Sequence, residues 1–252
     1  MAMLAAQLYT VREFTKTPAD IVETMKKVAA IGYRAVQLSA LGEMDPQELR
    51  DVCDGEGLTI CATHVGYDFM AGSTAECIER HQIYGCTYAG IGGLPGDYRS
   101  AEGYARFAVE ASETARKLLE GGIRFVYHNH NFELEKYGDR TGLQILYEDS
   151  DPEVFLSEID TYWIQAGGGS PATWIRSLAG GAPVVHLKDM TMQGRDQIMA
   201  EIGEGNLDWP DILEACAEAG VDYYIVEQDT CQRNPFESLA ISYQNLNAMG
   251  LE

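Results

Sequence analysis

Residues 184–189 read Val-Val-His-Leu-Lys-Asp, and this short stretch indicates the class of fold. It opens with two valines, so both faces of the predicted strand begin apolar, as is typical of a strand covered on both sides. Side chains alternate along a strand, which puts Val184, His186 and Lys188 on one face. A hydrophobic residue followed by an imidazole and an ammonium on the same face is expected where the interior of a barrel opens into a site. A pair on the surface rim is the alternative.

This strand belongs to a strand-then-helix unit that recurs along the whole chain. In the first unit, a predicted strand over 4–9 precedes a predicted helix over 18–31. Thr17 can cap this helix, Pro18 suits its first position, and Gly32 can end it. The other predicted strand and helix pairs are 33–38 and 46–55, 58–64 and 73–83, 86–91 and 101–119, 123–128 and 141–148, 154–159 and 171–178, 184–187 and 209–219, and 223–226 and 235–249.

Strands that alternate with helices pair in parallel, because the helix is the crossover between them. Eight such units in 252 residues predict an α/β protein with a single (β/α)8 TIM barrel domain over 1–252. A doubly wound open sheet is the alternative. The first strand is not followed by a glycine-rich GxGxxG loop, which counts against a dinucleotide-binding form of that alternative.

The composition limits the partners of the protein. With 39 Asp and Glu against 18 Lys and Arg, the formal net charge is −21, which counts against nucleic acid, because phosphate binding needs a basic patch. A hydrophobic content of 46% excludes intrinsic disorder. We find no signal peptide, no membrane-spanning run and no CxxC pair among six cysteines. These features predict a cytoplasmic protein with reduced thiols and no membrane partner.

Polar side chains gather at the ends of the predicted strands, which form the active-site rim of a TIM barrel. The fifth strand runs into the densest polar cluster of the sequence, at 127–133, and Glu227 ends the apolar eighth strand. Glu158 and Asp160 share a face at the end of the sixth strand, whereas His81 is the one histidine in a predicted helix. The histidines at strand ends are His64, His128, His130 and His186.

Strands five to eight therefore each offer a carboxylate or an imidazole at the predicted mouth. Mixed oxygen and nitrogen ligands suit Mn²⁺, Zn²⁺, Fe²⁺ or Co²⁺, and the absence of cysteine here counts against a structural zinc site. Two carboxylates beside a metal also supply an acid–base pair that can move a proton between neighbouring carbons.

Six segments, in this order along the chain, give the sequence a family resemblance. It resembles the xylose isomerase-like TIM barrels, which include proteins described as sugar phosphate isomerases/epimerases. The segments are QLYTVR at 7–12, YHNHNFE at 127–133, IDTYW at 159–163, HLKD at 186–189, IGEGNLDW at 202–209 and VEQD at 226–229.

The resemblance implies one divalent metal ion (Mn, Zn, Fe, Co or Mg), held by residues from strands five to eight. Carried onto this sequence, Asp160, His186 and Glu227 are three of the ligands. Glu133 is the expected fourth ligand, but it lies a few residues beyond the fifth strand, so His128 or His130 can replace it. A homodimer is a further expectation from the family.

The implied activity is a metal-dependent isomerase or epimerase of carbohydrate metabolism. Its partner would be a small sugar, sugar phosphate or keto-sugar, and protons would move through an enediolate. The expected catalytic residues are Glu227, Glu133 or His130 as bases and Lys188 as the group that stabilises negative charge. The expected substrate-binding residues are His64, His128, Glu158 and Trp163. A lyase or hydratase of 3-keto-glycosides, an abasic-site endonuclease and a non-catalytic barrel are the alternatives.

Overall fold

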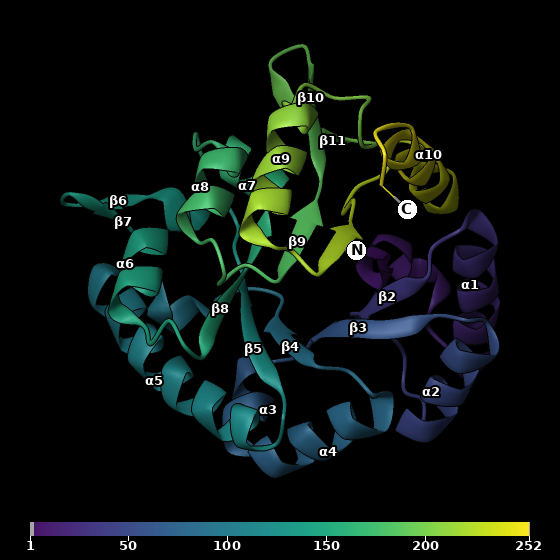
Figure 1. Cartoon of the computed structure of the whole chain (residues 1–252), viewed down its shortest axis with the longest axis horizontal. Coiled ribbons are helices and arrows are strands. Elements are labelled where there is room, and N and C mark those ends of the chain that lie inside the picture. Colours follow the sequence, from purple (N-terminus) through teal and green to yellow (C-terminus); the bar gives the residue numbers. More distant parts are fainter. Residues whose placement is uncertain (1–2, 252) are drawn as a thin grey trace.

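The computed structural model describes residues 3–251, in which eight parallel strands close into a barrel surrounded by helices (Figure 1). The order of the strands around the barrel is β1-β12-β9-β8-β5-β4-β3-β2. This arrangement confirms the predicted TIM barrel. The strands are β1 (Met3–Gln7), β2 (Ala35–Leu38), β3 (Thr59–His64), β4 (Tyr88–Ile91), β5 (Arg124–His128), β8 (Phe155–Asp160), β9 (Val184–Leu187) and β12 (Tyr223–Val226).

The helices begin and end where local sequence signals place them. Helix α1 has a capping box, in which the Thr17 side chain accepts from the backbone N–H of Asp20 and the Asp20 carboxylate accepts in return. It ends at Gly32, whose φ of +129° favours glycine. The helices are α1 (Pro18–Ile31), α2 (Pro46–Gly55), α3 (Tyr67–Gly72), α4 (Thr74–Tyr84), α5 (Ala101–Glu120), α6 (Gly142–Asp149), α7 (Thr161–Ala166), α8 (Pro171–Ser177), α9 (Trp209–Ala219) and α10 (Pro235–Ala248).

Some predicted boundaries were wrong. The first strand ends at Gln7 rather than at residue 9, and a 3-10 helix, η1 (Leu8–Phe14), follows it. Leu8 and Val11 are buried by η1, so the apolar run that suggested a longer strand belongs to two different elements. Two further short 3-10 helices are η2 (Gly96–Tyr98) and η3 (Phe132–Leu134).

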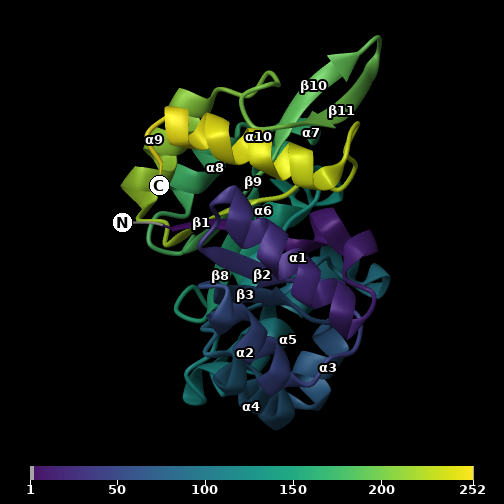
Figure 2. The same cartoon turned by 90° about the vertical axis from the view of Figure 1, so that its right-hand side faces the viewer.

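Two antiparallel hairpins were not predicted. One is β6 (Lys136–Tyr137) with β7 (Arg140–Thr141), and the other is β10 (Asp189–Gln193) with β11 (Asp196–Ala200). The β10–β11 hairpin follows β9 directly and projects beyond the barrel (Figures 1 and 2). It therefore stands beside the carboxyl rim, where a barrel carries its site.

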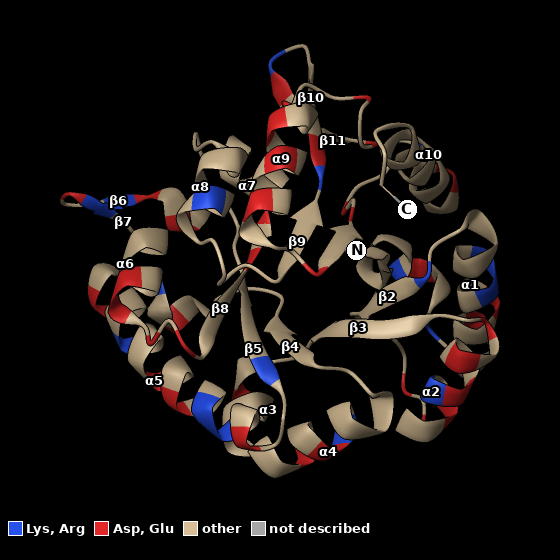
Figure 3. Cartoon of the chain, in the orientation of Figure 1, with Lys and Arg blue, Asp and Glu red and all other residues tan. Residues whose placement is uncertain are grey.

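The barrel interior contains a layer of apolar side chains near the amino ends of its strands, here called the lower layer. One residue or two from each strand contributes to it, and no member is more than 4% exposed. A second apolar cluster fills the space between the strands and the helices. Acidic side chains are spread over the outer helices (Figure 3). No helix within residues 3–251 is long and apolar enough to cross a membrane. The lower layer is Ala5, Ala35, Cys61, Ala62, Tyr88, Val126, Leu156, Val184 and Ile225.

Candidate active site

The site is a layer of polar side chains at the inward-facing positions that follow the apolar layer of the barrel. Side chains two residues apart lie on the same face of a strand, so each strand has a second inward-facing position two residues beyond the apolar layer, counted from Ala62 in β3. All of these except Gly90 are polar. A Cβ at Gly90 would lie 3.1 Å from Glu158 Oε2 and from His64 Cδ2, so a glycine leaves room for that pair. The members of this polar layer are Gln7, Gln37, His64, Gly90, His128, Glu158, His186 and Glu227.

Glu158 is the hub of one half of the layer. Its Oε2 lies 2.6 Å from His64 Nε2, and its Oε1 accepts a 2.7 Å hydrogen bond from Gln37 Nε2. His186 Nε2 lies 3.1 Å from the same Oε1. Burial raises the pKa of Glu158, but the neighbouring His186 and His64 outweigh it and hold this pKa well below its ordinary value. Glu158 is therefore a buried carboxylate that orients two imidazoles.

His186 connects this half to the other. Its Nδ1 lies 3.0 Å from Glu227 Oε2, while its Nε2 faces Glu158 and Gln37. Burial lowers the pKa of His186, but Glu158 and Glu227 outweigh it and raise this pKa to about 10. The ring is thus fixed on both of its nitrogens by acidic or amide oxygens.

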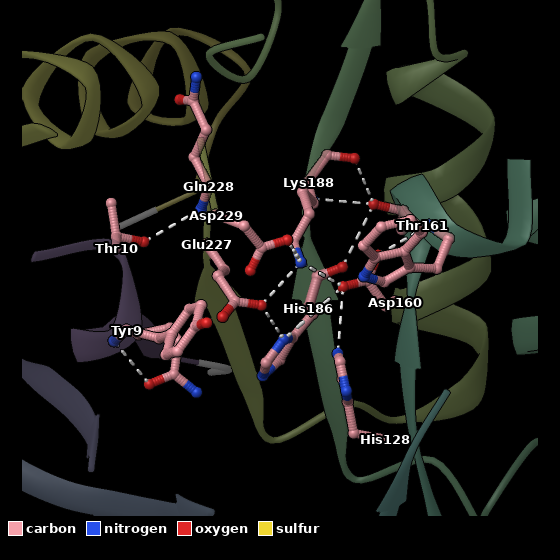
Figure 4. A network of polar contacts seen from close by, with 12 residues as sticks. Tyr9, Thr10, His128, Asp160, Thr161, His186, Lys188, Glu227, Gln228 and Asp229 are labelled. Atoms are coloured by element: carbon pink, nitrogen blue, oxygen red, sulfur yellow. Dashed lines mark hydrogen bonds and ion pairs between the residues drawn. The ribbon is translucent and has the colours of Figure 1, made fainter. Parts of the chain in front are cut away.

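Lys188 lies two residues beyond His186 and has no exposed surface. Its Nζ lies 2.9 Å from Asp160 Oδ2, 2.8 Å from Glu227 Oε2 and 3.0 Å from Asp229 Oδ2. Figure 4 shows the ammonium between Asp160 on one side and Glu227 and Asp229 on the other. Burial lowers the pKa of Lys188, but these carboxylates raise it well above its ordinary value. The lysine stays charged and neutralises part of a buried acidic cluster.

The two carboxylate oxygens of Asp160 have different roles, one in capping a helix and one in the site. Oδ1 accepts from the backbone N–H of Trp163 at 2.9 Å and so caps helix α7. Oδ2 faces Lys188 and lies 3.1 Å from His128 Nε2. Burial raises the pKa of Asp160, but Lys188 and His128 lower it to about 2. The helix cap thereby fixes the direction of the oxygen that points into the cluster.

Four side chains of this rim fit a metal ion. Single donor atoms of His128, Asp160, His186 and Glu227 all lie within 4.8 Å of one another, and all four residues are buried. Two imidazoles and two carboxylates are the ligand types that suit Mn²⁺, Zn²⁺, Fe²⁺ or Co²⁺. His186 presents Nδ1 to this group while Nε2 faces Glu158, and such a carboxylate behind a ligating histidine is the usual support of metal sites.

Glu133, the expected fifth-strand ligand, lies outside this group. Its Oε1 accepts from Tyr127 OH at 2.8 Å, and its Oε2 accepts from the backbone N–H of His130 at 2.9 Å. Both carboxylate oxygens therefore hold the loop after β5, and His128 is the β5 residue that faces Asp160. Burial raises the pKa of Glu133 to about 7, although the hydrogen bonds from Tyr127 and His130 oppose this shift.

This raised pKa predicts how stability depends on pH. The folded protein binds the proton of Glu133 more tightly than the unfolded chain, so the free energy of unfolding falls as pH rises from about 4.5 to about 7. The Glu133→Gln variant should lack this fall, which we expect to be about 3 kcal/mol. Urea unfolding at several pH values measures the difference. Glu135→Gln, at an exposed neighbour, is the control and should follow the wild type; equal pH dependence in all three proteins would contradict the assignment.

A cavity of about 380 Å³ lies over the cluster. Its wall includes His64, His128, His130, Trp163 and Glu227. Three buried atoms in this wall, His128 Nδ1, His130 Nδ1 and Trp163 Nε1, have no hydrogen-bond partner within residues 3–251. Burial and the neighbouring His128 lower the pKa of His130 to about 3, so this imidazole is neutral. Unpaired buried polar atoms around one cavity are suited to a polar ligand.

The structure brings most of the expected site residues to this rim. His64, His128, His130, Trp163 and Glu227 line the cavity. Beneath its wall lie Glu158, Asp160, His186 and Lys188, which are all fully buried.

Sequence reasoning missed Gln7, Gln37 and Asp229 as members of the site. Gln7 donates to Gln37 at 2.7 Å, and Gln37 bonds both Glu158 and His186. Each glutamine follows small or apolar residues in a strand, so a single polar residue inside an apolar run was the available signal. Burial and the nearby Glu227 raise the pKa of Asp229 to about 6.

The fold and the cluster define an α/β barrel of the TIM type with metal-type donors at its carboxyl rim. The chain belongs to the family of xylose isomerase-like TIM barrels, whose sequence profile matches residues 25–239. The family resemblance of the sequence is therefore confirmed. No curated protein sequence matches the chain.

Solved structures share the fold over nearly the whole chain. A sugar phosphate isomerase/epimerase from Parabacteroides distasonis ATCC 8503 has a TM-score of 0.82 and 19% identity, covering 99% of this chain and 95% of that one. An L-ribulose 3-epimerase has a TM-score of 0.75 and 14% identity over 98% and 94%. A family 2 AP endonuclease from Brucella melitensis has a TM-score of 0.73 and 15% identity over 100% of both chains. At these identities the likeness establishes the fold.

Proposed function

We propose that this protein is a divalent-metal-dependent isomerase or epimerase that acts on a sugar or keto-sugar by proton transfer. The observation that carries the proposal is the buried group of His128, Asp160, His186 and Glu227 beneath a cavity of about 380 Å³. A bound divalent ion at this group would polarise a carbonyl and a neighbouring hydroxyl and so acidify the adjacent C–H. The similarity to an isomerase/epimerase and to an epimerase supports this reaction class.

Two groups on separate sides of the cavity are suited to move the proton. Glu227 comes from the end of β12, and His130 follows β5, which is separated from β12 by β9 and β8. Glu227 is a carboxylate with a pKa held well below its ordinary value by Lys188 and His186 against the effect of burial, and His130 is a neutral imidazole. One group can remove a proton and the other can return one to the opposite face, as epimerisation requires.

The remaining polar residues hold this pair in place. Glu133 fixes the loop of His130 through its backbone N–H. Lys188 is fully buried and is not part of the cavity wall, so we assign it to neutralising Asp160, Glu227 and Asp229 rather than to substrate contact. His64 and Trp163 line the cavity and can donate to sugar oxygens.

The test is wash-in of deuterium from D₂O. We expect at least one ketose to gain one deuterium, measured by mass spectrometry, when the protein is supplied with Mn²⁺, and we expect EDTA to abolish the gain. A lack of deuterium in every ketose and 3-keto-glycoside tried would contradict proton transfer.

Elimination from a 3-keto-glycoside is the second candidate reaction. The observation that favours it is His64, which lines the same cavity and adds a further imidazole beside Glu227 and His130. After proton removal, such a group can protonate a departing glycosidic oxygen on the β-carbon. Release of the alcohol or phenol from a 3-keto-glycoside would favour this reaction over epimerisation.

A further inference from the structure

A second and larger cavity adjoins the one over the cluster. It measures about 740 Å³ and lies between the loop at residues 39–45 and the end of β3. Ser39 and His64 belong to the walls of both cavities. The two spaces are therefore compartments on either side of these residues, an inner cavity over the cluster and an outer groove that leads away from it.

The outer groove is held open by the fold. Its loop is tied down by a 2.7 Å hydrogen bond from the backbone N–H of Gly42 to the carbonyl oxygen of Thr15. A Cβ at Gly42 would collide with the Lys16 carbonyl, so only glycine allows this approach. Ala40 has a φ of +55°, a left-handed conformation that costs a non-glycine residue about 1 kcal/mol. A loop that is tied and strained in this way favours a groove formed before any ligand binds.

The wall of the groove is acidic and apolar. Glu43, Asp45 and Glu48 contribute carboxylates, while Leu41 and Met44 are half-buried. Arg80 is the arginine in this wall, and its guanidinium is paired with Glu76 at 2.9 Å. Carboxylates accept hydrogen bonds from hydroxyls and repel anions, so the groove suits an uncharged ligand rich in hydroxyls rather than a phosphate.

A third cavity, of about 280 Å³, contains two arginines near the site, and each already faces oxygen atoms of the protein. Arg12 donates to the carbonyl oxygens of Tyr9 and Asp229 at 2.8 and 3.0 Å. Arg233 lies 3.2 Å from Glu201 Oε1 and 3.9 Å from Glu237 Oε1. These contacts use two donors of Arg12 and partly neutralise the charge of Arg233, which makes both arginines less available to a phosphate group.

We propose that the substrate is a keto-sugar with an uncharged glycosidic substituent, whose reacting ring lies in the inner cavity and whose second sugar lies in the outer groove. The link between the two rings would pass between Ser39 and His64, which both compartments share. The proposal rests on the proposed function for the identity of the reacting ring. The inference adds that the substrate carries a second sugar and has no charge.

The experiment compares ketoses that share one reacting sugar. Isothermal titration calorimetry with Mn²⁺ present would measure the binding of fructose, fructose 6-phosphate and three glucosyl- or galactosyl-fructoses (turanose, isomaltulose and lactulose). We expect at least one disaccharide to bind about tenfold more tightly than fructose or better. We expect fructose 6-phosphate to bind no more tightly than fructose.

Leu41→Trp fills the groove and should reduce the disaccharide-to-fructose affinity ratio by about tenfold. Leu178→Trp is the matched control, because Leu178 is also a half-buried leucine in a groove, of about 530 Å³, on the outer surface beside α6 and α8. This control should keep the wild-type ratio.

The outcomes separate this inference from the proposed function. A disaccharide preference that Leu41→Trp removes supports the inference, even where no ketose gains deuterium and proton transfer fails. Deuterium gain in fructose with no disaccharide preference overturns the inference and leaves the proposed function standing. Tightest binding by fructose 6-phosphate, an unchanged ratio in Leu41→Trp, or binding by none of the five ketoses also overturns it.

Discussion

Replacing Lys188 by methionine is expected to lower the free energy of unfolding by about 3–5 kcal/mol in protein stripped of metal. The ammonium has no exposed surface and lies within 3.0 Å of three carboxylates, from Asp160, Glu227 and Asp229. Methionine matches the length of the side chain, so the cost comes from leaving these carboxylates without their cation. At low pH the carboxylates of the variant can be protonated, so the cost should grow as pH rises.

Urea unfolding of wild type and Lys188→Met, in EDTA at pH 5 and pH 8, measures this cost. Lys26→Met is the matched control, because Lys26 forms an exposed pair with Glu23 at 2.7 Å, and its unfolding midpoint should not change. An unchanged midpoint for Lys188→Met at pH 8 would show that the ammonium does not neutralise the cluster.

Two of the eight barrel strands could be predicted from sequence to the residue. The predicted strands 184–187 and 223–226 match β9 and β12, because both are short apolar runs with polar residues immediately after them. The first strand could not be predicted so well, because Leu8 and Val11 are as apolar as the strand yet are buried by a 3-10 helix. Periodicity alone does not tell a buried strand from the buried turn that follows it.

The loop that follows the β10–β11 hairpin could not be predicted for a different reason. Asp189 lies two residues beyond the predicted strand 184–187, and it accepts hydrogen bonds from the backbone N–H groups of Gly203, Gly205 and Leu207. These bonds join residues 14 to 18 positions apart, so no local pattern reports them. The Asp189 carboxylate therefore holds the loop that follows the hairpin, although Asp189 lies close to His186 and Lys188 in the sequence.

Part of the site was predictable, because the alternation of side chains along a strand fixes which of them point into the barrel. Asp160, His186 and Glu227 come together because Asp160 and His186 lie on inward-facing positions of β8 and β9, and Glu227 takes the next inward-facing position just beyond β12. Glu133 could not be placed in this way, since it follows the end of β5 by five residues and its loop turns through η3. His128 is the last residue of β5 and follows the strand parity, which is why it, rather than Glu133, faces Asp160.

Replacing Asp160 by asparagine is expected to abolish both cation binding at the cluster and the proposed proton transfer. We expect kcat/KM for deuterium wash-in to fall by about 10³-fold or more, which corresponds to about 4 kcal/mol of transition-state stabilisation. Asparagine caps helices as well as aspartate does, so the bond from the Trp163 N–H to the side-chain oxygen and helix α7 should both persist. The variant loses the negative charge on the oxygen that faces His128 and Lys188.

Thermal unfolding measures the binding of the cation independently of activity. Mn²⁺ at about 100 times its dissociation constant should stabilise the wild type by about 2.7 kcal/mol and should leave the Tm of Asp160→Asn unchanged. Asp208→Asn is the matched control, because Asp208 caps α9 in the same way from an exposed position, and it should keep both the activity and the Mn²⁺ response. An equal Mn²⁺ response in Asp160→Asn would place the ion away from this cluster.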